Sequence, residues 1–147
     1  MPAPAGFANG VSPCRCRSST PAGAPPTPPS TRRWLDRAAR LFTEPGLHRL
    51  MEARVLVIGM GGVGSFAAES LARSGIGELV LVDFDDVCVT NANRQLHALR
   101  GNIGQAKVEV MAERLRLVNP AATITPVARF YEADASDELL AGRIDFV

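Results

Sequence analysis

An unbroken apolar run that ends in a glycine-rich turn restricts the fold of this chain more than any other feature. Residues 54–58 read RVLVI, and residues 59–64 read GMGGVG, with glycines at the first, third and sixth positions. A β-rich run without polar interruption is typical of a strand that is covered on both faces of a parallel sheet. Glycines at this spacing, between a strand and a helix, form a phosphate-binding turn. The sequence therefore predicts a nucleotide-binding α/β unit that starts at residue 54.

Expected strands and helices alternate along the rest of the chain. Further strands are expected at residues 79–82, 123–128 and 144–147, and helices at residues 34–42, 47–51, 65–74, 103–118 and 135–141. Residues 43–46, TEPG, break the two helices that precede the first strand. The helix over residues 65–74 is expected because four of its residues recur at helical spacing: Phe66, Ala67, Leu71 and Ser74. This alternation predicts a Rossmann-like, doubly wound α/β fold with a mainly parallel sheet, of which the chain holds about the first half.

The first 33 residues differ in composition from the rest. They hold eight of the eleven prolines and no Asp or Glu, so we expect a disordered tail (1–33) before a folded part (34–147). A transit peptide and a start codon assigned too far upstream are alternative explanations. Cys14 and Cys16 have no second Cys or His pair nearby, which argues against a metal site.

Charge and cysteine usage limit the partners and the compartment. Four of the 16 Lys and Arg residues and none of the 15 Asp and Glu residues fall in the tail, so the folded part has a net charge of −3. That balance gives no basic footprint for nucleic acid. No apolar run is long enough for a membrane span. Because only Cys88 remains in the folded part, no disulfide framework is expected, and the cytoplasm is the predicted location.

The residues after the second expected strand bear on which nucleotide is bound. Asp83 ends that strand, where a carboxylate accepts hydrogen bonds from a ribose diol, and this suits NAD and ATP equally. The stretch that follows presents Asn91, Arg94, Gln95 and Lys107. Two cations near a phosphate cradle suit a triphosphate, because they offset the charge that develops as pyrophosphate leaves. A solvated surface loop explains the composition equally well.

The order of four motifs resembles the ATP-binding half of the ubiquitin-activating-enzyme-like, ThiF-type adenylating superfamily. The motifs are GMGGVG at 59–64, DFD at 83–85, NANRQ at 91–95 and GQAK at 104–107. Within the superfamily, the segments ARSGIGELVLVDFDDVCVTNANRQLHAL and MAERLRLVNP most resemble the tRNA threonylcarbamoyladenosine dehydratases. The resemblance implies ATP-dependent activation of a carboxylate by adenylation, here to cyclise a modified adenosine in tRNA.

The resemblance also implies roles for individual residues. Gly59, Gly61, Gly62 and Gly64 would contact the nucleotide and its phosphates, and Asp83 would bind the ribose. Arg94 and Lys107 would hold the triphosphate, Asn91 and Gln95 would shape the phosphate pocket, and Asp85 would lie beside it. Arg40, with Arg37 as the second choice, would reach the ATP of the other subunit across a homodimer. The aspartate that binds Mg²⁺ in this superfamily is expected beyond Val147, so we expect no metal ligand in the chain and no complete adenylation by the chain alone.

Three other hypotheses stay open. The substrate could be the C-terminal carboxylate of a ubiquitin-like sulfur-carrier protein instead of tRNA. The chain could be a non-catalytic nucleotide-binding fragment, or an NAD-dependent dehydrogenase. The remaining reactive residues are assigned structural roles: Cys88 as a packed small hydrophobe, His48 and His97 as structural side chains, and Met51, Met60 and Met111 as core residues.

Overall fold

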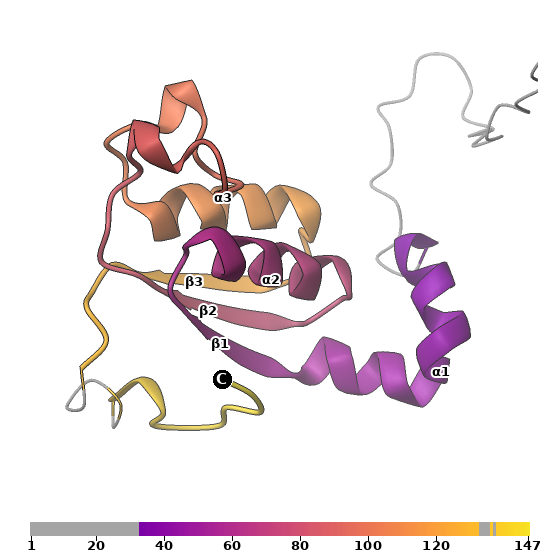
Figure 1. Ribbon diagram of the computed structural model, residues 1–147. Helices are drawn as coiled ribbons and strands as arrows, with labels where there is room; N and C mark the ends of the chain where they lie inside the picture. The colour runs from indigo at the N-terminus through magenta and orange to yellow at the C-terminus, as the bar shows by residue number, and fades with distance from the viewer. Residues whose placement is uncertain (1–32, 133–135, 137) are drawn as a thin grey trace, which may run out of the picture.

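Three parallel strands form the centre of the computed structural model, which describes residues 33–132, 136 and 138–147 (Figure 1). The strands are β1 (Arg54–Ile58), β2 (Glu78–Val82) and β3 (Thr123–Val127), in the order β1-β2-β3. The three strands begin at the same level of the sheet, because Arg54 pairs with Glu78 and Glu78 pairs with Thr123. The carboxyl ends of the strands therefore meet at one edge of the sheet.

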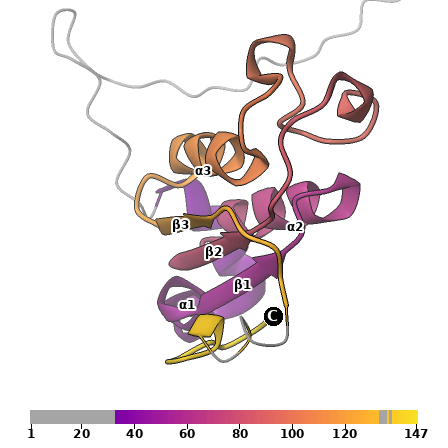
Figure 2. The ribbon, with the colours of Figure 1, turned by 90° about the vertical axis from the view of Figure 1, so that its left-hand side faces the viewer.

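Two helices cover one face of this sheet. Helices α2 (Gly62–Arg73) and α3 (Lys107–Val118) lie side by side above the strands in both views (Figures 1 and 2). They bury the main apolar core, whose fully buried members are Met60, Ala68, Ala72, Leu79, Leu81, Val108, Met111, Ala112 and Leu115.

The opposite face of the sheet has a smaller apolar cluster. Leu56, Val80 and Val82 are buried there against partly buried residues from the segment after β3, among them Tyr131 and Ile144. Side chains on both faces of the strands are therefore removed from water, which explains why RVLVI and LVLV have no polar alternation. These findings confirm the Rossmann-like α/β fold with an open parallel sheet.

The helical segment before β1 breaks where the sequence indicates. After the short turn η1 (Arg33–Leu35), helix α1 (Asp36–Glu52) has a kink at Thr43, whose φ of 63° and ψ of 166° are not helical. Pro45 follows the kink within the helix. The expected pair of helices with a break over residues 43–46 is therefore confirmed.

Helix α3 begins four residues later than expected, at Lys107 instead of residue 103. Residues 104–107 pair instead with the segment that follows β2. Val87 N donates to Gln105 O (2.8 Å) and Gly104 N to Val87 O (2.9 Å), and Asp86 and Ala106 form an antiparallel bridge. This pairing places Lys107 in the first turn of the helix. Between the paired segments lie two short 3₁₀ turns, η2 (Val89–Asn91) and η3 (Arg100–Asn102).

The expectations for the end of the chain are met in part. Phe146 forms one parallel bridge with Val55, on the side of β1 away from β2, so the chain changes direction there as in a doubly wound sheet. This bridge stands where the fourth strand was expected. Of the expected helix at 135–141, residues 136, 138 and 139 are helical, while 135 and 137 lie outside the described residues. The predicted tail also lies outside them, except for Arg33.

Two side-chain predictions are wrong. Cys88 is exposed instead of packed, because Val87 on one side of it takes the buried position. Met51 is 41% exposed, whereas Met60 and Met111 are fully buried as expected. His97 is 1% exposed, and His48 lies on the exposed surface of α1 beside Glu52. Among the described residues, no helix has the length and apolar character needed to cross a membrane.

Candidate functional site

The glycine turn forms an open cradle between β1 and α2. Gly59 has a φ of +88°, and its N–H donates to Val82 O at the end of the neighbouring strand (2.7 Å). A Cβ at Gly64 would lie 1.7 Å from Gly59 O, so only glycine lets the helix approach the strand this closely. A Cβ at Gly61 would meet nothing within 4 Å. The turn is therefore tight on its inner side and open on the side where the N–H groups of the first turn of α2 are available to an anion.

Asp83 holds the cradle to the end of β2. Its Oδ2 accepts the backbone N–H of Met60 (2.5 Å), and its Oδ1 accepts that of Asp85 (2.8 Å). The carboxylate is half-buried and keeps lone pairs that could accept hydroxyl groups. Asp83 therefore has a structural task in addition to the predicted ribose contact.

The loop after β2 brings Arg94 over the N-terminus of α2. A Cβ built at Gly62 would lie 3.4 Å from Arg94 Cγ, and the exposed guanidinium donates to Thr90 O (3.2 Å). Asn91 is buried, and its Oδ1 caps the η2 turn by accepting Cys88 N (3.0 Å). Gln95 is 7% exposed, and its Oε1 has no hydrogen-bond partner among the described residues. The aliphatic part of Arg94 therefore packs against Gly62 at the start of α2, with its guanidinium bonded to its own loop, whereas Asn91 shapes that loop.

Lys107 is a buried cation at the same edge of the sheet. Its side chain is 6% exposed, and Nζ lies 2.5 Å from Oδ2 of Asp85, whose side chain is 48% exposed. The backbone N–H of Lys107 also donates to Asp85 O (3.0 Å). The sequence singles out both residues, but their pairing with each other is visible only in the structure.

A pocket of about 320 Å³ opens beside the cradle at the carboxyl ends of the strands. Ile58, Gly59 and Val82 line its apolar part, and Asp83 and Asp85 line its polar part. Phe84 and Phe130, which also line it, form an edge-to-face pair with ring centroids 4.8 Å apart. The sequence analysis missed both aromatic residues, although Phe84 stands between the two aspartates that it selected.

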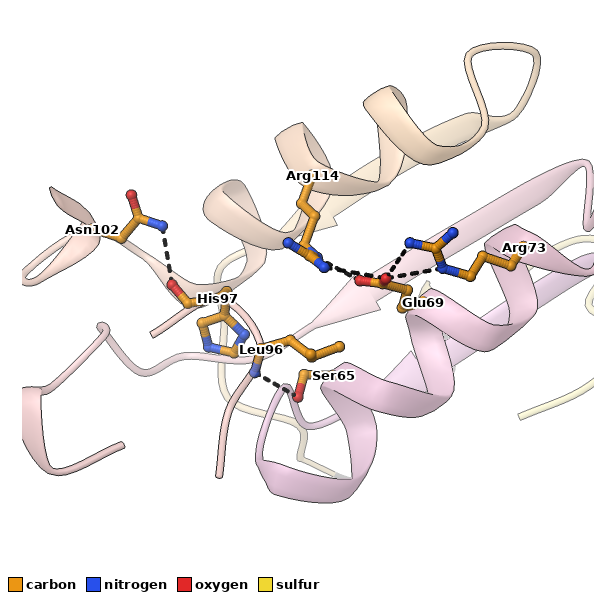
Figure 3. Close-up of polar contacts among 7 residues, drawn as sticks. All are labelled: Ser65, Glu69, Arg73, Leu96, His97, Asn102 and Arg114. Carbon is orange, nitrogen blue, oxygen red and sulfur yellow. Dashed lines mark hydrogen bonds and ion pairs between the residues drawn. The ribbon is translucent and has the colours of Figure 1, made fainter. Parts of the chain in front are cut away.

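A polar network joins α2 to α3 behind the cradle (Figure 3). Glu69, on the buried side of α2, accepts hydrogen bonds from Arg114 of α3 and from Arg73 one turn along α2. The hydrogen bonds from Arg114 are the main cause that lowers the pKa of Glu69. Ser65 Oγ accepts Leu96 N (3.4 Å), which ties the loop that carries Arg94 to the first turn of α2. The sequence pattern gave no signal for the contacts of Arg114 with Glu69 and of Leu96 with Ser65, because each joins segments that are far apart along the chain.

Arg37 and Arg40, which the family resemblance assigns to the nucleotide of another subunit, do not lie at the cradle of their own chain. Arg40 and Arg37 are exposed on α1, which leads into the amino end of β1, whereas the cradle lies at the carboxyl end (Figure 1). Within one chain neither arginine is therefore brought to the cradle. In the part of the chain that the structure describes, no group of three or more His, Cys, Asp or Glu residues is arranged to hold a metal ion.

The geometry fits a nucleotide with several phosphates. The cradle has a helix N-terminus and an open side at Gly61, Arg94 lies above it, and Lys107 adds a second cation. The adjacent pocket offers an apolar floor for a base and the Asp83 carboxylate for a sugar diol. Such a site can bind a nucleoside triphosphate and stabilise the negative charge of a leaving phosphate group.

Comparisons with known proteins identify the family to which the chain belongs. The family model described as ThiF family matches residues 35–147. A tRNA threonylcarbamoyladenosine dehydratase of Escherichia coli (strain K12) is 57% identical over 96 residues, which are 65% of this chain and 36% of that protein. A molybdopterin-synthase adenylyltransferase of Salmonella typhimurium is 45% identical over 103 residues, 70% of this chain and 41% of that protein. The crystal structure of the E. coli dehydratase in complex with ATP superposes with a TM-score of 0.75 at 50% identity, covering 77% of this chain and 46% of that one.

The chain thus spans less than half the length of each of these relatives. The family match nevertheless covers nearly all of the described residues, including the cradle, Asp83, Arg94 and Lys107. The chain belongs to the ThiF family.

Proposed function

We propose that this member of the ThiF family provides the ATP-binding part of an enzyme that activates a carboxylate by adenylation. The observation that carries the proposal is the pair of cations at the cradle, Arg94 over the N-terminus of α2 and the buried Lys107. A nicotinamide dinucleotide needs a glycine turn and a ribose-binding carboxylate but no such cations. A triphosphate needs both cations, because its charge is larger and increases further as pyrophosphate leaves.

Each residue would have a defined task toward ATP, which is a substrate of this reaction. In adenylation a substrate carboxylate attacks the α-phosphorus, and pyrophosphate leaves. The N–H groups at the start of α2 would bind phosphate oxygens, and Asp83 would accept the ribose hydroxyls. Arg94 and Lys107 would hold the departing phosphates. Magnesium ions usually accompany such phosphates and take carboxylate oxygens as further ligands. The aspartate expected to bind Mg²⁺ lies beyond Val147, and Asp85 would lie beside the phosphates as the partner of Lys107.

We further propose tRNA threonylcarbamoyladenosine as the target of the whole protein. The basis is the 57% identity to the E. coli dehydratase, against 45% to the molybdopterin-synthase adenylyltransferase. The net charge of −3 outside the tail gives no independent support for a tRNA partner. Adenylation of a sulfur-carrier protein is the second candidate, supported by the adenylyltransferase relative. Pyrophosphate exchange into ATP, stimulated by modified tRNA or by a sulfur carrier, would separate the two.

Binding measurements on three variants test the proposed site. Arg94→Ala and Lys107→Ala should each weaken ATP binding by about tenfold or more, because each removes a charge-assisted contact to phosphate. Arg100→Ala is the matched control, since Arg100 is an exposed arginine of the same loop, in η3. Calorimetric titration with ATP and NAD gives the readout. The proposal fails if the first two variants bind ATP as the control does.

The homodimer and the cytoplasmic location remain predictions. For the dimer, we expect Arg40 to act on the nucleotide of the other subunit. Light scattering on the full chain measures the oligomeric state, and Arg40→Ala should then weaken ATP binding without changing that state.

A further inference from the structure

Helices α2 and α3 both begin at the nucleotide site and run away from it along the same face of the sheet (Figures 1 and 2). α2 begins at Gly62 in the cradle, and α3 begins at Lys107. Both helices connect parallel strands, so they point in the same direction. Any sliding of α3 along α2 would therefore change the distance between Lys107 and the cradle.

Apolar packing alone leaves that sliding poorly defined. The contact between the helices consists largely of small and apolar residues, with Ala68 and Ala72 on α2 and Val108, Met111 and Ala112 on α3 in one buried cluster. The hydrophobic effect is non-directional. It favours contact between the helices but discriminates weakly between neighbouring registers. Buried polar pairs are the groups best known to fix a register between helices.

Among the described residues, one pair of charged side chains crosses this interface. Arg114 donates from both Nε and Nη2 to the carboxylate of Glu69, with Nη2 to Oε1 at 3.1 Å, and Glu69 is only 8% exposed (Figure 3). A forked arginine–carboxylate contact constrains both distance and orientation. Glu69 is seven residues past Gly62, and Arg114 is seven residues past Lys107, so each lies about 10 Å along its helix from the site.

We propose that Glu69 and Arg114 set the axial register of α3 against α2 and thereby position Lys107 relative to the phosphate cradle. Neither side chain reaches the nucleotide, so both are positioning residues, and the inference rests on the proposed ATP binding. At the far end, Asn119 Nδ2 donates to Ala72 O (3.3 Å) and Ile76 O (3.2 Å). We expect these hydrogen bonds of Asn119 to keep the helices together in variants that lack the Glu69–Arg114 pair.

The structure also supplies the opposing explanation. Lys107 is bonded to Asp85 through both its backbone N–H (3.0 Å) and its side chain (2.5 Å). If these contacts suffice to position Lys107, the pair between the helices has no effect on the nucleotide. The two explanations predict different results for the same variants.

Calorimetric titration of the full chain with ATP and with AMP tests the inference. AMP lacks the outer phosphates that Lys107 would contact. Arg114→Ala should therefore weaken ATP binding about tenfold and change AMP binding less than about twofold. A tenfold effect lies within the range of interaction energies measured between coupled residues. Arg114→Lys should recover part of the loss. Arg73→Ala is the matched control, because Arg73 pairs with the same Glu69 oxygen from within α2 (2.6 Å) and leaves the contact between helices intact.

A double-mutant cycle with Lys107→Ala decides whether the effect acts through Lys107. In that background Arg114→Ala should change ATP binding by less than about twofold, since there is no lysine left to position. Equal losses for ATP and AMP, or an undiminished loss in the Lys107→Ala background, would overturn the inference. So would unchanged ATP binding by Arg114→Ala.

Two further readouts keep the outcomes distinct. If Arg114→Ala fails to fold, Glu69→Gln takes its place as the test variant. Glu69→Gln retains an oxygen acceptor but loses the charge, so it should weaken ATP binding by a smaller factor, again with little change in AMP binding. Circular dichroism monitors the fold of each variant. Failure of the proposed function has its own signature, which is the absence of ATP binding by the unmodified chain, and that result would overturn the inference as well.

Discussion

Lys107 and Asp85 form an ion pair at the carboxyl edge of the sheet, with Nζ 2.5 Å from Oδ2. The lysine side chain is almost wholly buried, whereas half of the aspartate side chain faces solvent. The lysine charge is therefore balanced by the Asp85 carboxylate. If Lys107 binds phosphate as proposed, a phosphate chain in the cradle would compete with Asp85 for the ammonium group, and the carboxylate would repel that phosphate chain.

Asp85→Asn should therefore strengthen the binding of bare phosphate chains. In a buffer free of divalent cations, we expect tripolyphosphate to bind about three to five times more tightly, as for removal of a partly exposed competing charge. The same change should lower the free energy of unfolding by about 1–2 kcal/mol, because the buried Lys107 loses its partner. Asp86→Asn, at the exposed neighbouring position, is the control for both measurements. Unchanged tripolyphosphate affinity in Asp85→Asn would show that the pair does not compete with phosphate.

Two glycine substitutions should separate ligand binding from folding. A Cβ at Gly61 enters the open side of the cradle, so Gly61→Ala should keep its stability and weaken ATP binding about tenfold. A Cβ at Gly64 collides with Gly59 O, so Gly64→Ala should lose about 1–3 kcal/mol of stability. Urea unfolding and calorimetric titration of both variants check these expectations. Equal losses of stability in the two variants would contradict the geometry of the cradle.

The strands and the cradle could be predicted because their signals are local. RVLVI and LVLV are apolar without interruption, and the glycine spacing follows directly after the first of them, so residues 54–64 identify a strand and a turn without any tertiary information. The same holds for the break before Pro45. The family resemblance then predicts roles for Arg94 and Lys107, and the structure places Arg94 beside Gly62 and Lys107 beside Asp85.

The inner face of α2 could not be predicted in this way. The apolar pattern favours Phe66 and Leu71, but Phe66 is 52% exposed. The buried positions are Ser65, Ala68, Glu69 and Ala72. Small residues are buried there because α3 packs closely, and the charged Glu69 is buried because Arg114 pairs with it. Both reasons depend on α3, whose Arg114 lies 45 residues after Glu69. Hydrophobic periodicity within α2 contains no information about that helix.

The start of α3 and the exposure of Cys88 were mispredicted for a similar reason. Residues 103–106 include Gly104, whose φ of +83° is not helical, and pairing with the segment around Val87 takes backbone groups of Gly104 and Gln105. That pairing buries Val87 and turns Cys88 outward, where Thr90 Oγ1 donates to its sulfur (3.2 Å) and lowers the pKa of the thiol.

Stability should depend on pH through His97. The side chain is 1% exposed, and neither ring nitrogen has a hydrogen-bond partner among the described residues. Burial lowers the pKa of His97 from its ordinary value of 6.5, and the charge of Lys107 lowers it further, while Asp83 opposes the shift. The unfolded chain therefore binds a proton at a pH where the folded chain does not. The contribution of neutral His97 to the free energy of unfolding is complete above pH 6.5. Below pH 6.5 the free energy of unfolding falls, by up to about 1.4 kcal/mol per pH unit, until the pH reaches the pKa of His97 in the folded chain.

Urea unfolding between pH 5 and pH 8 measures this dependence. His97→Leu should flatten the loss of stability below pH 6.5, because no group with a lowered pKa remains at that position. His48→Leu is the control, since His48 is exposed on α1 and away from the core. The account of His97 is wrong if His97→Leu and the unmodified chain lose stability equally as the pH falls.

Direct competition between ATP and NAD for the unmodified chain tests the central claim, that the glycine cradle is a triphosphate site. Titration with a fluorescent ATP analogue, followed by displacement with each unlabelled nucleotide, gives both affinities in one experiment. We expect ATP to displace the analogue at a concentration at least about tenfold lower than NAD, because only ATP presents a triphosphate to Arg94 and Lys107. Displacement by NAD at an equal or lower concentration would contradict the assignment.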